Sequence, residues 1–255
     1  MTNVVALRRT PKVEEPERIS AIVVAGSGGA ASTTTTYGLA TALRLGSGAD
    51  VAAIDGTSDG GNLLDRTAAD PIDSARAIRQ LGSRMAVSTA GVVVVGHGDT
   101  TDPALVDGLL SDRHLARFHD VGPALRSRRL GPLIEAGAGI VIVAPARSEP
   151  LSRMRDGLGW QMNTYGAEVL ARTIVAISHQ MPDTLLDLAP IRDALAPRTA
   201  GFVEVPFDAA LTQPGRLDHR RLSPAALDAW TDALDALGQI TTPHTDTDET
   251  AGELA

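Results

Sequence analysis

A glycine-rich segment near the start of the chain has the composition of a phosphate-binding turn. It follows the apolar run Ala21–Ala25 and reads Gly-Ser-Gly-Gly-Ala-Ala-Ser-Thr-Thr-Thr-Thr over residues 26–36. Glycines let the backbone approach a ligand closely, and the first N–H groups of a following helix can bind an anion. The alternative is a tight turn whose small residues serve packing alone. The pattern favours a site for a phosphate-bearing ligand.

Two nucleotide-binding interpretations compete for this turn. In the first, Gly26, Gly28 and Ala31 match a relaxed dinucleotide fingerprint, and Asp55 stands where an acidic residue would hold an adenosine ribose. This interpretation predicts an oxidoreductase that binds NAD(P) or a flavin. However, four consecutive threonines are unusual where a helix must pack closely on a strand. A catalytic Tyr-x-x-x-Lys is also excluded, because the only lysine of the chain is Lys12.

The second interpretation accounts for more of the chain. Residues 27–34 read Ser-Gly-Gly-Ala-Ala-Ser-Thr-Thr, and Tyr-Gly-Leu-Ala follows at 37–40. This stretch resembles the deviant Walker A loop of the MinD/ParA family of P-loop NTPases (SIMIBI class), which reads Lys-Gly-Gly-x-Gly-Lys-Thr-Thr. The resemblance covers about residues 20–238 and is nearest to degenerate members of actinobacterial type.

Three later segments extend the resemblance in the same order. Ile54–Leu63 resembles the family's Asp-x-Asp-Pro-Gln-Gly-Asn segment, and Phe118–Pro123 stands where the family has its Walker B-like Asp-Thr-Pro. Val203–Asp208 resembles the late strand and proline that approach the adenine, which places Pro206 on the adenine side. The resemblance therefore implies a nucleotide-binding fold that holds ATP or ADP with Mg²⁺.

The resemblance also implies a role for each position of the degenerate loop. Gly28 and Gly29 keep glycines of the family pattern, whereas Ala31 replaces one. Ser27 replaces the signature lysine that reaches the phosphates of a dimer partner. Ser32 replaces the lysine that holds the β- and γ-phosphates. The loop is thus predicted to keep its backbone contacts and to lose both of its charged contacts.

The remaining family positions concern Mg²⁺ and the attacking water. Thr33 keeps the hydroxyl expected to bind Mg²⁺, and Thr34 can contact the α-phosphate. Asp55 and Asp120 stand at magnesium or switch positions, where they act either on the cation or as helix caps and turn formers. Thr57 falls where the water-orienting aspartate belongs. The general base or water positioner is therefore missing.

The basic residues decide between an active and an inactive site. Lysine and arginine number 23 together, so 22 are arginines and no realignment can supply a lysine after Lys12. A charged hydrogen bond contributes about 1.5–3 kcal/mol, so two missing lysines remove about 3–6 kcal/mol, or about 10²–10⁴ in affinity. Phosphoryl transfer depends on such charges. An alternative is an unconventional ATPase of the partitioning type in which Arg147 or Arg153 replaces lysine.

We therefore expect a MinD/ParA-like pseudo-ATPase, in which hydrolysis is lost and binding of nucleotide is weak or absent. Such a protein would act as a scaffold or regulatory partner of another protein in secretion, conjugation or partitioning. Because the family dimerises around ATP through the missing signature lysine, nucleotide-driven dimerisation is doubtful. A homodimer that forms without nucleotide stays open.

Short apolar runs predict the elements that must position this site. They are rich in Val and Ile, and they lie at residues 21–25, 51–54, 91–96, 139–144, 173–178 and 202–205. Continuous hydrophobicity predicts strands covered on both faces, hence an α/β fold with one doubly wound, mostly parallel sheet and helices on both faces. The segment 114–119 is too polar for a buried central strand. A last helix is predicted from Pro224 to Gly238.

Composition bounds the domain organisation and the class of protein. The chain has 255 residues, no cysteine and a net charge of −8. We expect a flexible arm at 1–18, one α/β domain at 19–240 and an acidic disordered tail at 241–255. The histidines do not have the spacing of a structural metal site. Negative charge and the lack of a long apolar run predict a cytoplasmic protein without direct membrane insertion, for which nucleic acid is an improbable partner.

Overall fold

The computed structural model describes residues 18–58, 61–74, 76–99, 102–114, 116–183 and 186–241. Within these residues one nine-stranded sheet has the order β3-β4-β5-β2-β6-β1-β7-β8-β9. The strands from β5 to β9 in this order are parallel, and β4 pairs antiparallel with both β5 and β3. The strand bounds are β1 Ile19–Ala25, β2 Val51–Asp55, β3 Ala68–Ile72, β4 Met85–Ser88, β5 Val93–Val95, β6 Ala116–Asp120, β7 Gly139–Pro145, β8 Thr173–Ser178 and β9 Gly201–Val205.

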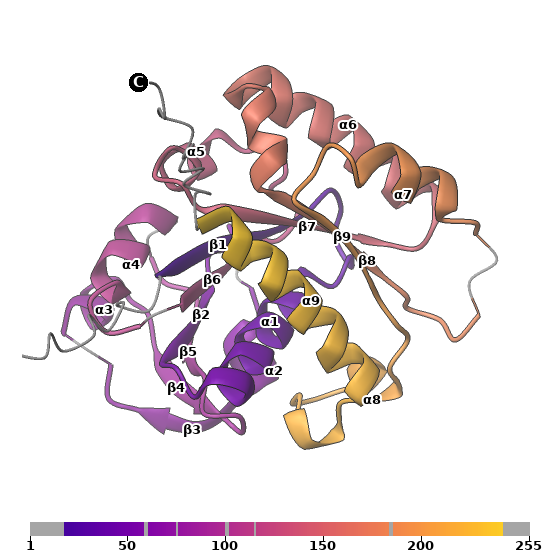
Figure 1. Cartoon of the computed structure of the whole chain (residues 1–255). Coiled ribbons are helices and arrows are strands. Elements are labelled where there is room, and N and C mark those ends of the chain that lie inside the picture. Colours follow the sequence, from indigo (N-terminus) through magenta and orange to yellow (C-terminus); the bar gives the residue numbers. More distant parts are fainter. Residues whose placement is uncertain are drawn as a thin grey trace, which may run out of the picture.

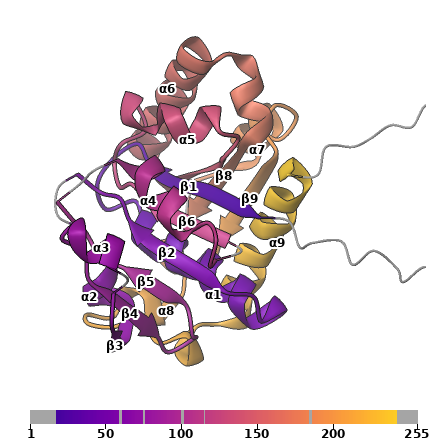
Figure 2. The same cartoon turned by 90° about the vertical axis from the view of Figure 1, so that its left-hand side faces the viewer.

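Helices cover both faces of the sheet, as Figures 1 and 2 show. One face packs against α1 and α9, with Tyr37 and Trp230 in its core, and the other packs against α5, α6 and α7. The predicted α/β class is therefore confirmed. The helix bounds are α1 Ser32–Ser47, α2 Leu63–Thr67, α3 Arg76–Gln80, α4 Pro103–Leu110, α5 Gly131–Glu135, α6 Ser148–Tyr165, α7 Ala189–Leu195, α8 Ala209–Thr212 and α9 Pro224–Thr241.

The strand order separates the two nucleotide-binding interpretations. In the dinucleotide fold the first strand of the domain lies directly beside the second. Here β6 lies between them, because it pairs with β1 on one side and with β2 on the other. The aspartate that ends β6 is thereby brought beside the turn that follows β1. This strand order differs from that of the dinucleotide fold and therefore favours the second interpretation.

Strand β6 corrects the prediction drawn from its polarity. All five of its residues are buried, although Arg117 and His119 point to one face of the sheet. Asp107 on α4 covers that face, and one of its carboxylate oxygens lies 2.9 Å from Arg117 Nε and 2.8 Å from His119 Nε2. The Arg117 guanidinium also donates to the His114 carbonyl at 3.0 Å. A central strand can carry such polar residues when groups on neighbouring parts of the chain bind them.

The ends of the domain are described only in part. Most of the predicted arm and of the predicted acidic tail lies outside the described residues. Helix α9 does not end at Gly238 as predicted but runs to Thr241. Among the described residues, no helix has the length and apolar character needed to cross a membrane.

Candidate functional site

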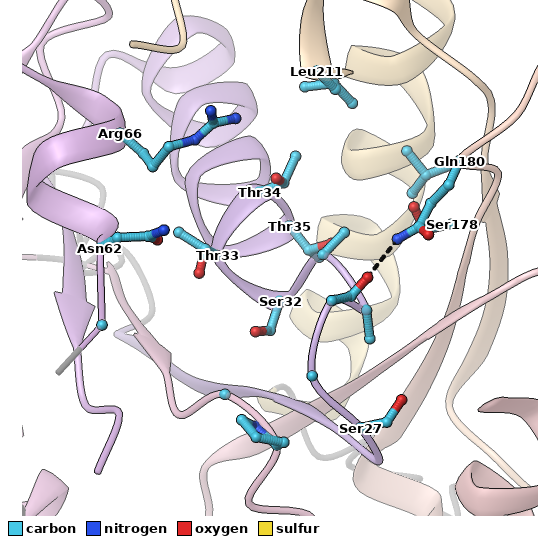
Figure 3. A pocket seen from close by; sticks show the side chains of 18 of the residues that line it. Ser27, Ser32, Thr33, Thr34, Thr35, Asn62, Arg66, Ser178, Gln180 and Leu211 are labelled. Atoms are coloured by element: carbon cyan, nitrogen blue, oxygen red, sulfur yellow. Dashed lines mark hydrogen bonds between the residues drawn. The ribbon is translucent and has the colours of Figure 1, made fainter. Parts of the chain in front are cut away.

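A cavity of about 570 Å³ lies at the carboxyl ends of the central strands, which is where ligands bind in open α/β sheets. Three walls form most of its lining: the turn 27–31 with the first turn of α1, Thr57 with residues 61, 62 and 66, and the residues at and after the ends of β8 and β9. Gly122, Pro123 and Trp230 complete the lining. Figure 3 shows these walls facing one another. Hydroxyl groups of Ser27, Ser32, Thr33 and Thr34 dominate the first wall.

The backbone of the turn is shaped to receive an anion. Gly29 and Ala31 have left-handed φ angles of 71° and 74°, which turn the chain sharply into α1. Ala31 is the N-cap of this 16-residue helix, and no side chain caps it. The first N–H groups of α1 therefore have no partner within the helix and face the cavity with the positive end of the helix dipole. This arrangement suits a phosphate group.

Replacement of Ala31 by glycine is expected to raise the free energy of unfolding by about 1 kcal/mol, because a left-handed conformation costs an L-residue about 1–2 kcal/mol. Urea unfolding measures the change. The neighbouring buried Ala30 provides the control, since no left-handed φ is recorded for it. Ala30→Gly is expected to lower stability by at least about 0.4–1 kcal/mol. Equal effects of the two changes would contradict the strain at Ala31.

Asp120, at the end of β6, connects the turn to the centre of the sheet. Its carboxylate accepts a hydrogen bond from the Thr33 hydroxyl at 2.5 Å and another from the Gly122 N–H at 3.1 Å. Burial raises the pKa of Asp120 above its ordinary value, although hydrogen bonds from Thr33 and Ser32 oppose the shift. A buried carboxylate paired with a hydroxyl is a donor set that suits Mg²⁺.

Asp55, at the end of β2, shapes the second wall from behind. One carboxylate oxygen accepts from the Thr57 hydroxyl at 2.7 Å, and the other accepts from the Leu63 N–H at the start of α2. The Thr57 oxygen in turn accepts from the Gly61 N–H at 2.7 Å. Asp55 therefore acts as a turn former that fixes α2. Thr57 lines the cavity with its hydroxyl already engaged on both sides.

The third wall closes against the turn. The Gln180 side chain, beyond β8, donates a hydrogen bond to the Gly29 carbonyl at 2.7 Å (Figure 3). Further along, Val205, Asp208 and Leu211 line the cavity, whereas Pro206 lies between two of them without lining it. Both oxygens of Asp208 accept backbone N–H groups, from Ala210 and Ser223.

The arginines proposed from the sequence as lysine substitutes do not line this cavity. Arg153 pairs with Glu149 at 2.5 Å, and the Arg147 guanidinium donates to the Gln180 side chain at 3.3 Å. Instead Arg66, on α2, is the arginine among the described residues that lines the cavity. Its side chain extends from α2 toward α1 (Figure 3). Sequence analysis missed Arg66, whose only signal is that it follows the segment resembling the family's Gly-Asn motif.

Comparisons with known proteins place this geometry in a fold family. No protein-family model matches the chain, and no curated protein sequence matches it. Among solved structures, MinD from Pyrococcus furiosus aligns with a TM-score of 0.60 at 18% identity, covering 87% of this chain and 99% of that one. A ParA family ATPase from Chlorobium tepidum aligns with a TM-score of 0.59 at 11% identity, covering 89% and 97%. This chain has the ParA/MinD fold.

Within the ParA/MinD fold the likeness extends beyond partitioning proteins. Cobyrinic acid a,c-diamide synthase from Mycobacterium smegmatis, solved with an ATP analog and magnesium, aligns with a TM-score of 0.54 at 14% identity, covering 88% and 95%. At these identities the comparison establishes the fold, and the activity must be inferred from the site. The structure brings all seven predicted loop residues to the cavity wall: Ser27, Gly28, Gly29, Ala31, Ser32, Thr33 and Thr34.

Proposed function

We propose that this chain is a ParA/MinD-type pseudo-ATPase, which binds a nucleotide weakly with Mg²⁺, does not hydrolyse it, and acts as a scaffold or regulatory partner of another protein. One observation carries the proposal. The turn and helix α1 have the backbone shape of a phosphate-binding loop, yet the wall they form presents only hydroxyls and backbone N–H groups and no charged side chain. The uncapped start of α1 and the hydrogen bond from Thr33 to Asp120 support binding. In this proposal Thr33 and Asp120 hold the cation.

Loss of hydrolysis follows from what the site lacks. Stabilisation of the transferred phosphoryl group requires positive charge, and the two lysine positions of the resemblance hold Ser27 and Ser32. Thr57 has no carboxylate, and Asp55 and Gly61 already engage its hydroxyl. Without a lysine in the loop and without a water-positioning group, the site can still bind a nucleotide but lacks the groups that hydrolysis requires. In this proposal the protein acts by binding another protein and not by hydrolysing ATP.

A calorimetric titration with ATP and with ADP, each with Mg²⁺, tests the proposal. We expect weak binding by the unmodified chain and no ATP turnover above background. The variant Ser27→Lys/Ala31→Gly/Ser32→Lys is expected to bind about 10²–10⁴ times more tightly, because two charged contacts return. Turnover by the unmodified chain that Thr33→Ala abolishes would overturn the pseudo-ATPase. Failure of both proteins to bind would overturn the nucleotide site.

A further inference from the structure

Arg66 differs from Arg147 and Arg153 in its position and its contacts. Its side chain is half-buried in the cavity wall, and no ion pair with a carboxylate is recorded for it within the described residues. Its recorded contact is a hydrogen bond of 3.2 Å from Nη1 to the carbonyl of Gln213. A guanidinium carries five N–H donors, so most of its capacity is unused. It presents positive charge to a cavity whose loop has lost its lysines.

The position of Arg66 is imposed by the hydrogen-bonded frame behind it. Asp55 fixes the first turn of α2 through the Leu63 N–H. Gly61 lies so close to Asp55 and Thr57 that a Cβ there would come within 2.4 Å of both. The end of β2, Thr57, Gly61 and the start of α2 are therefore held together. This unit holds Arg66 opposite the loop instead of leaving it on a mobile surface.

Arg66 also joins two walls of the cavity. Its guanidinium donates to the Gln213 carbonyl, and its own carbonyl accepts from the Leu217 N–H at 2.6 Å. Residues 211 and 212, which line the cavity, belong to the segment that these two bonds hold. Binding of an anion to Arg66 would therefore restrain the segment 209–217 as well as the loop.

We infer that Arg66 is the phosphate-binding cation of this site, and that it holds a di- or triphosphate from the side opposite the loop while it fixes the segment 209–217 over the ligand. The inference rests on the proposed function and deepens it. The loop N–H groups and Arg66 together enclose adjacent phosphates, whereas a ligand without phosphate receives nothing from either. Affinity should depend on the phosphate chain more than on the base.

Calorimetric titrations of the full-length chain with ATP, ADP, inorganic pyrophosphate and adenosine test the inference. We expect Arg66→Gln to weaken ATP, ADP and pyrophosphate binding about 10- to 100-fold, with no effect on adenosine. The affinity of Arg66→Lys for these phosphates should lie between that of the unmodified chain and that of Arg66→Gln, because lysine keeps the charge but lacks the planar guanidinium. Arg153→Gln is the matched control, and it should leave the affinity for ATP unchanged, because Arg153 pairs with Glu149 and does not line the cavity.

Hydrogen exchange of the segment 209–217 separates a ligand contact from a purely structural role. ATP should slow exchange of these amides in the unmodified chain and not in Arg66→Gln. Equal phosphate affinity of the unmodified chain and Arg66→Gln would overturn the inference and leave the proposed function standing. Absence of nucleotide binding by the unmodified chain would overturn both. A larger loss of ATP affinity from Arg153→Gln than from Arg66→Gln would show that Arg153, on α6, is the phosphate-binding cation, and would overturn the inference.

Discussion

Replacement of Asp107 by alanine is expected to lower the free energy of unfolding by about 3–5 kcal/mol, the cost of breaking a buried ion pair by removing one partner. A single oxygen of Asp107 accepts hydrogen bonds from Arg117 and Ser20 and contacts His119. The Arg117 and His119 side chains are 6% and 0% exposed. Without Asp107, a guanidinium and an imidazole remain buried in the central strand. Urea unfolding at pH 7 measures the loss.

The same carboxylate predicts a pH dependence. Burial raises the pKa of Asp107, but hydrogen bonds from His119 and Arg117 outweigh it and hold the pKa well below the ordinary 3.8. Because the folded pKa is depressed, this stabilisation is present above pH 3.8 and is lost as the pH falls below it. The difference in unfolding free energy between the unmodified chain and Asp107→Asn should therefore become smaller below pH 3.8.

Asp112→Ala is the matched control for Asp107. Asp112 approaches Arg18 only to 3.9 Å, with a side chain 93% exposed, and its removal should leave stability nearly unchanged. A loss below about 1 kcal/mol for Asp107→Ala, the range of an exposed pair, would contradict the buried network. A difference in unfolding free energy between the unmodified chain and Asp107→Asn that stays the same from pH 7 to pH 3 would also contradict it.

Replacement of Gly38 by valine is expected to destabilise the protein on the order of 3 kcal/mol, because the added atoms overfill a packed core. Gly38 lies in α1 where α9 crosses it, and a Cβ at this position would come within 2.2 Å of the Trp230 ring. The ring is 1% exposed, so α1 and α9 must separate to admit a side chain. Thermal and urea unfolding measure the effect.

Gly46→Val in the same helix is the control for Gly38. A Cβ at Gly46 meets no atom within 4 Å, and valine and glycine differ little in helix propensity. Gly46→Val should therefore be nearly neutral. If the two variants lost similar stability, the cause would be helix propensity and not the contact with Trp230.

Strand prediction succeeded for six of the nine strands among the described residues. Six continuous apolar runs predicted β1, β2, β5, β7, β8 and β9, because burial on both faces requires apolar residues at successive positions. Strand β3 was not predicted. It lies at the edge of the sheet and contains Asp70 and Pro71, which are tolerated only where one side of a strand is unpaired. Strand β3 has no fully buried residue, so no continuous apolar run develops in it. Strand β4, Met85–Ser88, was not predicted either.

Strand β6 shows why polarity alone misled the prediction. Arg117 and His119 are compatible with a central position only because Asp107, ten and twelve residues earlier, packs over them from α4. A periodicity window covers one element and does not show the partner that another element provides. The site was affected in the same way, because β6 also delivers Asp120 to Thr33.

The sequence by itself determined the composition of the site: no realignment could place a lysine in the loop, and the glycines and threonines after β1 indicated where a phosphate would lie. Only the tertiary structure decided which cation faces that loop. Arg66 reaches the cavity because Asp55 fixes α2 and because β6 separates β1 from β2. Such contacts join residues far apart in the chain, and their formation depends on packing that local patterns do not encode.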